Sequence, residues 1–345
     1  MRFRILLLIL LGIVALTLFV MFRPMTQNEK AVRIQLHQSS SIQEVADQLT
    51  EKDVLSGSTL FLYASRISGT KSIRAGSYLI KPSESLYNLM NQFRKGLQTP
   101  VKLILGNERV RLRTTRQLAA KMQRQQYSLA DSTAWSTFLQ SNDSLRAFSV
   151  DTFTVMSRLL PLTYEVYWTD SPKQIFEQIN KAWLKFWNKE RTEKSKSIGL
   201  NPTEVCILAS IVEEETQHSP DRPLIASTYL NRLRVKMPLQ ADPTAKFGSG
   251  DLDAKRVTFA HLRHESPYNT YLHSGLPPGP ICLPSIASID AVLNAPQTDY
   301  LYFVASHRFD GTSVFTKEYT QHLKNAKLYQ TMLTKRLNKK ANPNP

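Results

Sequence analysis

Cysteine and glycine are scarce in this chain, and basic residues outnumber acidic ones. Only Cys206 and Cys282 occur in 345 residues, which excludes a disulfide-built scaffold and a four-cysteine zinc site. The two can form one bridge or remain two unpaired apolar side chains, and the sequence leaves both open. The 12 glycines and 18 prolines exclude a collagen-like or low-complexity chain. Hydrophobic residues make up 42%, so the length predicts two folded domains, or one large domain with additions.

The excess of basic residues indicates an anionic partner. With 44 Lys+Arg against 28 Asp+Glu, the formal net charge is +16. Nucleic acid is one class of partner for such a balance, but the sequence has neither an RNP-type aromatic cluster nor zinc-finger spacing. Anionic lipid headgroups or an anionic cell-wall polymer fit better. The basic stretch 335–340 predicts a solvated, flexible tail over 333–345.

The N-terminus combines a basic start with a long apolar run. Residues 5–22 carry no charge, and a helix of that length spans about 27 Å, close to the hydrocarbon thickness of a membrane. A signal peptide has a similar order of features, but its apolar core is shorter, and no small-residue cleavage pattern follows here. The sequence therefore favours a retained transmembrane anchor over 1–23. Arg2 and Arg4 favour a cytoplasmic N-terminus, which would place the rest of the chain outside the cytoplasm.

Residues 31–98 contain a weak internal repeat of strand, short turn and capped helix. The predicted elements are a strand over 32–36, a helix from 42 to 49 capped by the serines at 39–41, an apolar helix at 60–64, a strand over 78–80 and a helix from 86 to 93. They describe a small α+β module. Such modules bind extended polymers in some families, and a plain structural spacer is the alternative.

The stretch 101–200 predicts further mixed structure. Its expected elements are a strand over 101–105, a helix over 115–125, a β-prone aromatic segment at 160–168 and an amphipathic helix over 172–189. The apolar face of the last helix carries Ile175, Ile179, Trp183 and Phe186. The charge run 189–196 predicts a solvated segment and a candidate hinge.

A buried helix and a hairpin are predicted after residue 200. Asn201 is a cap residue, Pro202 suits the first helical position, and the following residues 205–216 are apolar nearly all round. We therefore expect a buried central helix. Two short β-prone segments, 300–304 and 313–315, flank Asp310-Gly311 and predict a hairpin. The expected fold class is α+β.

The predicted central helix ends in three consecutive acids, Glu213, Glu214 and Glu215. Carboxylates are unfavourable at this end of a helix, and at about 100° per residue the three point in different directions. Glu213 lies on the side of the small residues Ala209 and Ser210, which predicts an open pocket around its carboxylate. Burial and acidic neighbours would favour its protonated form, the condition for a general acid near neutral pH. A solvated helix end is the alternative.

Other chemistries fit less well. His261, His264 and Glu265 are the residue types of a zinc helix in the wrong order, so we expect a surface segment there. The sequence has no Gly-x-Ser-x-Gly elbow and no Walker-type or dinucleotide-binding glycine loop. Cys206 has no histidine at a diagnostic spacing, which argues against a thiol nucleophile.

Four segments rich in amide, hydroxyl and aromatic groups follow the acidic helix. They are 231–233, 239–244, 268–271 and 275–280. Aromatic rings stack on the apolar faces of sugars, and amides bond hydroxyl and N-acetyl groups. Each segment alone is compatible with a plain turn, but together they predict a sugar-binding cleft.

These residues resemble the YceG-like family of endolytic murein transglycosylases. The motifs are 209–216 (Ala-Ser-Ile-Val-Glu-Glu-Glu-Thr), 229–233 (Tyr-Leu-Asn-Arg-Leu), 239–244 (Leu-Gln-Ala-Asp-Pro-Thr), 268–271 (Tyr-Asn-Thr-Tyr) and 275–281 (Gly-Leu-Pro-Pro-Gly-Pro-Ile). Phe315 and His322 fit the family's closing pattern. The ordered series is more specific than any single motif, and the resemblance covers most of the chain.

The resemblance implies three parts: the membrane anchor, a LysM-like module over 31–98 and a YceG-like catalytic domain over 100–332. It places the catalytic acid on Glu213 and a supporting acid on Glu215. It implies these further substrate-binding or supporting residues: Asn231, Arg232, Gln240, Asp242, Thr244, Tyr268, Asn269, Tyr271, Gly275 and His322. It implies no metal and no cofactor.

Two departures from the family pattern stand out. Residues 161–164 read Pro-Leu-Thr-Tyr where many relatives have Pro-Asp-Thr-Tyr, so any role of that acid is absent here. Residues 282–285 read Cys-Leu-Pro-Ser in place of a more usual Ala-Asn-Pro-Gly. We expect these changes to affect peripheral substrate contacts and to leave the acid untouched.

The implied reaction needs one carboxylate. Ordinary glycosidases use two, but a lytic transglycosylase cleaves the bond between N-acetylmuramic acid and N-acetylglucosamine without water. The muramic C6 hydroxyl attacks its own anomeric carbon and gives a 1,6-anhydro end, and this intramolecular attack replaces a protein nucleophile. Glu213 would protonate the glycosidic oxygen and then accept the C6 hydroxyl proton.

The resemblance thus implies an enzyme of the inner membrane that cuts nascent glycan strands internally on the periplasmic side and terminates their elongation. Its partners would be peptidoglycan glycan strands, membrane lipid through the N-terminal helix, and peptidoglycan synthases, with no nucleic acid. The competing hypothesis is a non-catalytic, membrane-anchored peptidoglycan-binding protein. A nucleic-acid binder, which would show steeply salt-dependent affinity for DNA, is the third.

Overall fold

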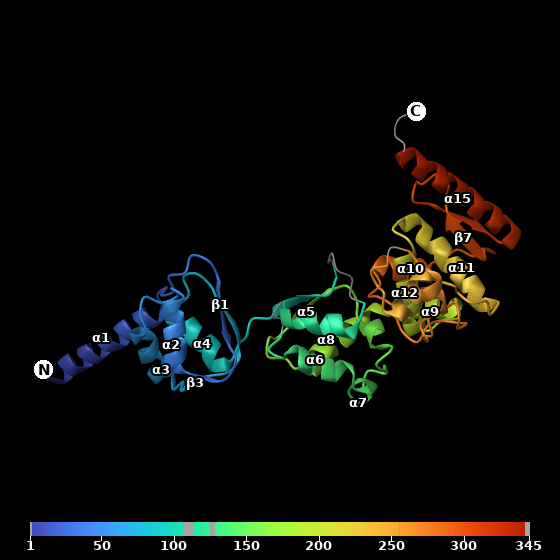
Figure 1. Cartoon of the computed structure of the whole chain (residues 1–345). Coiled ribbons are helices and arrows are strands. Elements are labelled where there is room, and N and C mark those ends of the chain that lie inside the picture. The colour runs from blue at the N-terminus through green and yellow to red at the C-terminus, as the bar shows by residue number, and fades with distance from the viewer. Residues whose placement is uncertain (1, 107–112, 125–127, 255, 342–345) are drawn as a thin grey trace. The chain divides into compact units, whose positions relative to one another are not determined.

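The computed structural model describes residues 2–106, 113–124, 128–254 and 256–341 (Figure 1). The chain divides into two units. Unit 1 comprises Met1–Leu103, Met122–Asp131 and Glu165–Ser171, and unit 2 comprises Ile104–Lys121, Ser132–Tyr164 and Pro172–Pro345. The chain first passes from unit 1 to unit 2 after Leu103, close to the boundary at 98–100 expected from sequence. Two later segments nevertheless return to unit 1, so the units are not consecutive in the chain.

The part of unit 1 before residue 104 consists of the N-terminal helix and a small α+β module. Its elements are α1 (Arg2–Phe22), β1 (Val32–Leu36), β2 (Ser40–Ser41), α2 (Ile42–Glu51), α3 (Thr59–Ser68), β3 (Ser72–Ile73), β4 (Gly76–Ile80), α4 (Leu86–Lys95) and most of β5 (Val101–Ile104). The strands β1 and β4, one from each copy of the predicted repeat, pair antiparallel with Ile34 opposite Tyr78. We call residues 24–99 the N-terminal module. The elements predicted for it are confirmed, with β2 and β3 in addition.

Local signals in the module set the ends of its helices. Ser41 caps α2 in a capping box with Glu44, and Ser85 caps α4. Gly96 ends α4 at φ 63°, a left-handed conformation that glycine adopts without steric cost. The apolar stripes of these helices cover the β1–β4 pair and form one buried core with α3.

Helix α1 is apolar along its length. Among the residues that the structure describes, it is the one helix long and apolar enough to cross a membrane, over Phe3–Phe22. Membrane anchors and signal sequences share this property. The last turn of α1 is part of the folded module, because Val20 and Met21 pack against the module's core.

The first part of unit 2 is mainly helical. Its elements are α5 (Thr115–Arg124), α6 (Ser132–Leu139), α7 (Asn142–Arg146), the 3₁₀ helix η1 (Val155–Arg158), β6 (Thr163–Val166), α8 (Pro172–Phe186) and α9 (Lys189–Ser197). The chain passes between the units within α5 and β6. The expected apolar face of α8 is buried at Ile175, Ile179 and Trp183. The charge run is solvated along most of its length, as expected, but it forms helix α9, which Asn188 caps, in place of a hinge.

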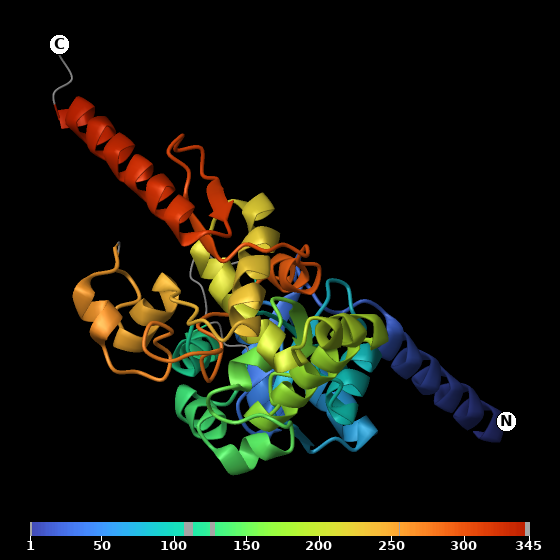
Figure 2. The same cartoon turned by 90° about the vertical axis from the view of Figure 1, so that its right-hand side faces the viewer.

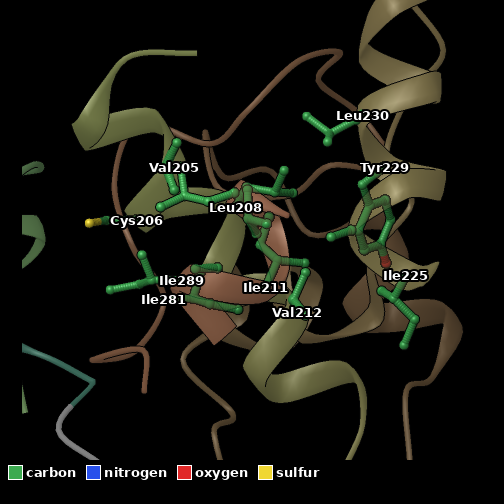
Figure 3. Close-up of a cluster of buried hydrophobic side chains, with 14 of the residues drawn as sticks. Val205, Cys206, Leu208, Ile211, Val212, Ile225, Tyr229, Leu230, Ile281 and Ile289 are labelled. Atoms are coloured by element: carbon green, nitrogen blue, oxygen red, sulfur yellow. The ribbon is translucent and has the colours of Figure 1, made fainter. Parts of the chain in front are cut away.

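The second part of unit 2 surrounds α10. Its elements are α10 (Pro202–Glu215), the 3₁₀ helix η2 (Ser219–Asp221), α11 (Arg222–Arg234), α12 (Asp242–Ser249), α13 (Phe259–Arg263), α14 (Ile286–Leu293), β7 (Tyr302–Ala305), β8 (Ser313–Thr316) and α15 (Tyr319–Ala341). Helix α10 is buried at nine consecutive residues, from Val205 to Glu213. Its apolar side chains meet those of α11 and α14 together with Ile281 (Figure 3). Both cysteines lie buried and unbridged.

The predicted hairpin forms from β7 and β8, which pair antiparallel with Phe303 opposite Phe315. Helix α15 packs along the hairpin (Figure 2). Residues 333–341, which we expected in a flexible tail, continue α15, and 342–345 lie outside the described residues. Lys, Arg and Leu in this stretch are good helix formers, and cations are favourable at a helix C-terminus.

Candidate active site

Helix α10 places Glu213 at its C-terminal end, deep in unit 2. Asn201 and Glu204 form a capping box at the other end, with Pro202 in the first position, as the sequence indicates. One turn before Glu213, the Ser210 hydroxyl accepts the backbone N–H of Ile281 at 3.0 Å. This bond holds the 275–285 loop beside the helix end that carries the acid.

Two serines from the start of α14 bind the Glu213 carboxylate. Oε2 accepts the hydroxyl of Ser285 at 2.5 Å and the hydroxyl of Ser288 at 2.6 Å. The backbone N–H of Ser285 donates to the same oxygen at 3.2 Å. Oε1 faces the Arg222 guanidinium at 3.4 Å. The open pocket that we expected around this carboxylate is therefore occupied by serine side chains, and only 8% of Glu213 is exposed.

These contacts favour the ionised form of Glu213. Burial raises the pKa of its carboxyl, but hydrogen bonds from Ser285 and Ser288, together with the Arg222 charge, bring that pKa below its ordinary value. Our expectation of a raised pKa at this residue was wrong. It counted burial and acidic neighbours but had no information about donors that arrive from about 75 residues downstream.

The raised pKa belongs to Glu215 instead. Burial raises the pKa of Glu215 to about 7, with a further rise from the Asp242 charge, and the Tyr229 hydrogen bond and nearby cations lower it only in part. The Tyr229 hydroxyl donates to Glu215 Oε1 at 2.6 Å. Since residues two apart on a helix point to nearly opposite sides, Glu213 and Glu215 occupy separate polar environments.

Glu214, between them, lines a cavity of about 190 Å³. Arg113 lies 3.5 Å from its carboxylate, and Lys246 and Phe247 of α12 contribute to the walls. Tyr268 packs on Phe247 with ring centroids 4.7 Å apart. Tyr268, one of the predicted sugar-contacting rings, thus packs against a residue that lines this cavity. The cavity lies at the acidic end of α10.

Asn231 and Arg232 hold α11 against the segment that leads into β7. The Asn231 amide donates to the carbonyls of Thr298 and Tyr300 at 2.9 and 3.0 Å. Arg232 donates to the carbonyls of Leu301 and Leu239, both at 2.7 Å. Both side chains are buried, so in this structure their polar groups serve the protein's own backbone.

The predicted residues of the 240–271 region are also joined by internal bonds. Thr244 is buried and shares a 2.7 Å hydrogen bond with Thr270, while the Asn269 amide donates to the backbone carbonyls of His261, Leu262 and His264. Asp242 is exposed and accepts the Tyr271 hydroxyl at 2.6 Å. The charges of Asp242 and Arg232 both act on Glu215, so the fold brings these predicted residues into one cluster.

The remaining predicted residues lie at turns and on α15. Gln240 is exposed and has a positive φ of 49°, and Gly275 has a φ of 92°. His322 stacks on Tyr302 at 5.3 Å, and Arg232 lies 5.4 Å from the same ring. Burial and the Arg232 charge lower the pKa of His322.

The segment around His261 is the surface segment we expected except at His261 itself. His261 is only 9% exposed, and its ring lies between Thr258 at 2.9 Å and Asp251 at 3.1 Å. His264 and Glu265 are exposed. Within the described part of the chain, no group of three or more His, Cys, Asp or Glu side chains could hold a metal ion.

Comparison with known proteins agrees with this arrangement of helices and loops. Residues 34–328 match the YceG-like family. This chain belongs to the YceG-like family. It is 30% identical over 338 residues to a Bacillus subtilis (strain 168) protein named endolytic murein transglycosylase, covering 90% of this chain and 88% of that protein.

Two further family comparisons differ in coverage. A Streptococcus pneumoniae (strain D39) protein of the same name is 26% identical over 310 residues, which are 81% of this chain but 55% of that protein, so this chain spans about half of its length. The crystal structure of a YceG-like protein from Listeria monocytogenes matches with a TM-score of 0.53 and 25% identity. That match covers 86% of this chain and 99% of the Listeria chain.

Within the YceG-like family, the departure at 282–285 now has a structural meaning. We expected it to leave the acid untouched, and this was wrong, because Ser285 donates both its hydroxyl and its N–H to Glu213. A glycine at position 285 would keep the N–H but has no hydroxyl. Sequence reasoning also missed Arg222, Tyr229 and Ser288. The departure at 282–285 marked Ser285, and Tyr229 opens the motif at 229–233, whereas Arg222 and Ser288 carry no signal in the sequence.

Proposed function

We propose that this protein is an endolytic lytic transglycosylase that cleaves the β-1,4 bond between N-acetylmuramic acid and N-acetylglucosamine in nascent peptidoglycan and leaves 1,6-anhydro ends. The observation that carries the proposal is the match of residues 34–328 to the YceG-like family, whose motif acid, Glu213, lies at a polar, solvent-shielded helix end. The likeness to proteins named endolytic murein transglycosylases supports the reaction class.

Glu213 has the environment of a proton acceptor in the free enzyme. Its ionised carboxylate can take the C6 hydroxyl proton of the muramic residue as O6 attacks the anomeric carbon. To donate a proton to the glycosidic oxygen, it must first be protonated. Sugar rings that displace water from the site raise the pKa of the carboxyl by desolvation, so that it takes up a proton from solvent before the bond breaks. The donated and accepted protons balance, and no water is consumed.

Glu215 is the second candidate for the proton donor. A pKa of about 7 leaves a large fraction of Glu215 protonated at neutral pH, which is the state a general acid requires. Its hydrogen bond from Tyr229 fixes one carboxylate oxygen. In the proposed reaction we assign Glu215 to support of the cleft and Glu213 to proton transfer, and substitution separates the two roles.

The proposed location is the periplasmic face of the inner membrane, with α1 retained as a single-pass anchor. Packing of Val20 and Met21 into the core of the N-terminal module supports retention, because cleavage at the end of α1 would expose that core. The proposed partners are glycan strands, membrane lipid and peptidoglycan synthases. In this assignment the N-terminal module is the LysM-like glycan-binding part.

Glu213→Gln tests the function. Purified peptidoglycan is digested with the full-length protein, and the soluble products are identified by mass spectrometry, where an anhydro end is lighter than a reducing end by one water. Glu213→Gln should reduce anhydro products by about 10²–10⁴-fold without changing the circular dichroism spectrum. Glu318→Gln, an exposed carboxylate at the start of α15, serves as the matched control and should retain full activity.

Each outcome of this experiment decides between assignments. Full activity of Glu213→Gln together with loss of activity in Glu215→Gln would move proton transfer to Glu215. Binding of peptidoglycan by the wild-type protein with no soluble fragments would favour the non-catalytic anchored binding protein and would overturn the proposed function.

A further inference from the structure

The junction between α1 and the N-terminal module contains no free linker. The backbone N–H of Arg23 still bonds to the carbonyl of Phe19, as in a helix. Only two residues later, the N–H of Met25 bonds to the carbonyl of Glu84 at 2.8 Å. The Thr26 hydroxyl accepts the N–H of Glu84 at 2.8 Å. If α1 crosses the membrane, as in the proposed function, the module begins within a few residues of the bilayer.

A groove opens where α1 meets α3 and α4. It has a volume of about 370 Å³ and is mainly apolar. Leu18, Met21 and Phe22 of α1 line one side, and Ile67 of α3 with Tyr87 and Arg94 of α4 line the other. Phe22 and Tyr87 stack with ring centroids 4.7 Å apart. The groove therefore combines the last turn of the apolar helix with two helices of the module.

The depth of the groove matches the interfacial region of a bilayer. Leu18 and Phe22 are four residues apart, about 6 Å along the helix axis, and Phe22 is the last residue of the apolar span. Side chains beside this turn lie where hydrocarbon gives way to headgroups. Tyrosine is enriched at this level in membrane proteins because its ring is apolar and its hydroxyl is polar.

Exposed apolar side chains continue from the groove onto α3. Ile67 is 52% exposed and Tyr87 46% exposed, although both line the groove. Tyr63, one turn before Ile67 on the same face of α3, is 50% exposed. Cations flank these side chains, with Arg94 in the groove wall, Arg66 exposed on α3, and Arg23 directly after α1. Apolar contacts with cations at their edge match the acyl chains and phosphate of a phospholipid.

We propose that this groove is a phospholipid site that holds the N-terminal module against the bilayer surface. The acyl chains and glycerol of an anionic phospholipid lie between α1 and the α3–α4 pair, with the phosphate beside Arg94. The proposal rests on the retained anchor of the proposed function. Its consequence is that the module has a fixed orientation on the membrane, as opposed to swinging freely beyond it.

Spin labelling of the full-length protein in phospholipid vesicles tests the site. Ile67→Cys carries a nitroxide at the groove, and Gln38→Cys carries one on an exposed turn at the far end of β1. Cys206 and Cys282 are buried, so the wild-type protein treated with the same nitroxide reagent should remain unlabelled and serves as the control. The label at position 67 should collide more with oxygen, which partitions into lipid, than with a water-soluble nickel complex. The label at position 38 should show the reverse.

Equal nickel accessibility at positions 67 and 38 would overturn the proposal. Failure of the anchor gives a different result, because the intact mass would then lack the N-terminal helix and the protein would leave the vesicles. A second measurement tests whether the site selects an anionic headgroup. Wild-type protein should immobilise spin-labelled phosphatidylglycerol in preference to phosphatidylcholine, and Arg94→Gln should remove that preference. Because both lipids carry the phosphate, an unchanged preference in Arg94→Gln would exclude Arg94 as the cation that selects the anionic headgroup.

Discussion

At the residue scale, the properties of Glu213 depend on its neighbours more than on its burial. Three donors converge on its Oε2, two of them hydroxyls at 2.5 and 2.6 Å, and Arg222 donates to Oε1. Hydrogen bonds to a charged group contribute about 1.5–3 kcal/mol each, which is enough to overcome desolvation at a side chain that retains a little solvent contact. The Glu213 carboxyl is therefore ionised at neutral pH.

Ser285→Gly should raise the pKa of Glu213 by removing one hydroxyl donor. The inflection that Glu213 contributes to the pH profile of anhydro-product release should move to higher pH, by about one unit. Glycine is the suitable replacement because Ser285 also caps α14, and glycine at an N-cap costs only a few tenths of a kcal/mol.

Ala287→Gly provides the control for Ser285→Gly, since Ala287 is exposed in the same turn of α14. Its pH profile should coincide with that of the wild type. An unshifted inflection in Ser285→Gly would show that the serine hydroxyl does not stabilise the ionised acid in solution.

Glu215 should make the stability of the protein depend on pH. Its folded-state pKa of about 7 lies above the ordinary value of 4.5, so folding favours the protonated form. The resulting stability is fully present below about pH 4.5 and is lost as the pH rises through 7. Glu215→Gln keeps an acceptor for Tyr229 and removes this loss. We therefore compare the free energy of unfolding of the variant with that of the wild type, both obtained from thermal unfolding. The difference should increase in favour of the variant by about 2 kcal/mol between pH 5 and pH 8. A constant difference across this range would contradict the raised pKa.

At the element scale, the 275–281 loop reaches α10 because one glycine permits close packing. A Cβ added at Gly279 would meet the carbonyl oxygen of Phe153 at 2.0 Å, a distance that backbone atoms cannot tolerate. The loop then continues to Ile281, whose N–H bonds to Ser210 on α10. The glycine of this predicted sugar-cleft motif is thus required by packing.

Gly279→Ala should destabilise the protein by about 1–3 kcal/mol and should lower activity, because the loop carries Ser285 toward Glu213. Urea unfolding monitored by tryptophan fluorescence measures the loss. Gly57→Ala is the control, since a Cβ there meets no atom within 4 Å. Equal stability of the two variants would show that the loop moves away from Phe153 without cost.

At the scale of the whole molecule, unit 1 depends on residues far along the chain. Trp168 is 3% exposed and packs edge-on against His37, with ring centroids 5.0 Å apart. The Gln98 amide donates to Thr169 at 2.7 Å. A chain cut at residue 100, where the sequence places the domain boundary, would lack these contacts.

Trp168→Ala should therefore weaken unit 1, although residue 168 lies far from the module in sequence. Removing a buried tryptophan costs about 3–5 kcal/mol, so hydrogen exchange of β1 and β4 should become faster. Trp135→Ala, at a fully buried position in unit 2, should leave exchange of these strands unchanged. If Trp168→Ala also left it unchanged, residues 165–171 would not be part of unit 1 in solution.

Much of the fold could be predicted from sequence because its signals are local. The stripe of α4, the cap of α10 and the alternation in β1 each depend on residues within one or two turns. Most of the expectations that were wrong concern contacts between residues separated in sequence, while the one at 333–341 was wrong because the helix propensity of that stretch was not weighed. His261 is buried in contact with Asp251, and the charge run forms α9, which contacts α14 through Arg191 and Asp290.

By itself, the sequence determined the apolar N-terminal helix, the order of the elements in the N-terminal module and the position of the acidic motif at the end of a buried helix. Each of these follows from side-chain periodicity and short-range capping. Only the tertiary structure decided which carboxyl is ionised, because the pKa values of Glu213 and Glu215 depend on Ser285, Ser288 and Tyr229. Electrostatic interactions act through space over a few ångströms, and the chain brings these groups together only when it folds.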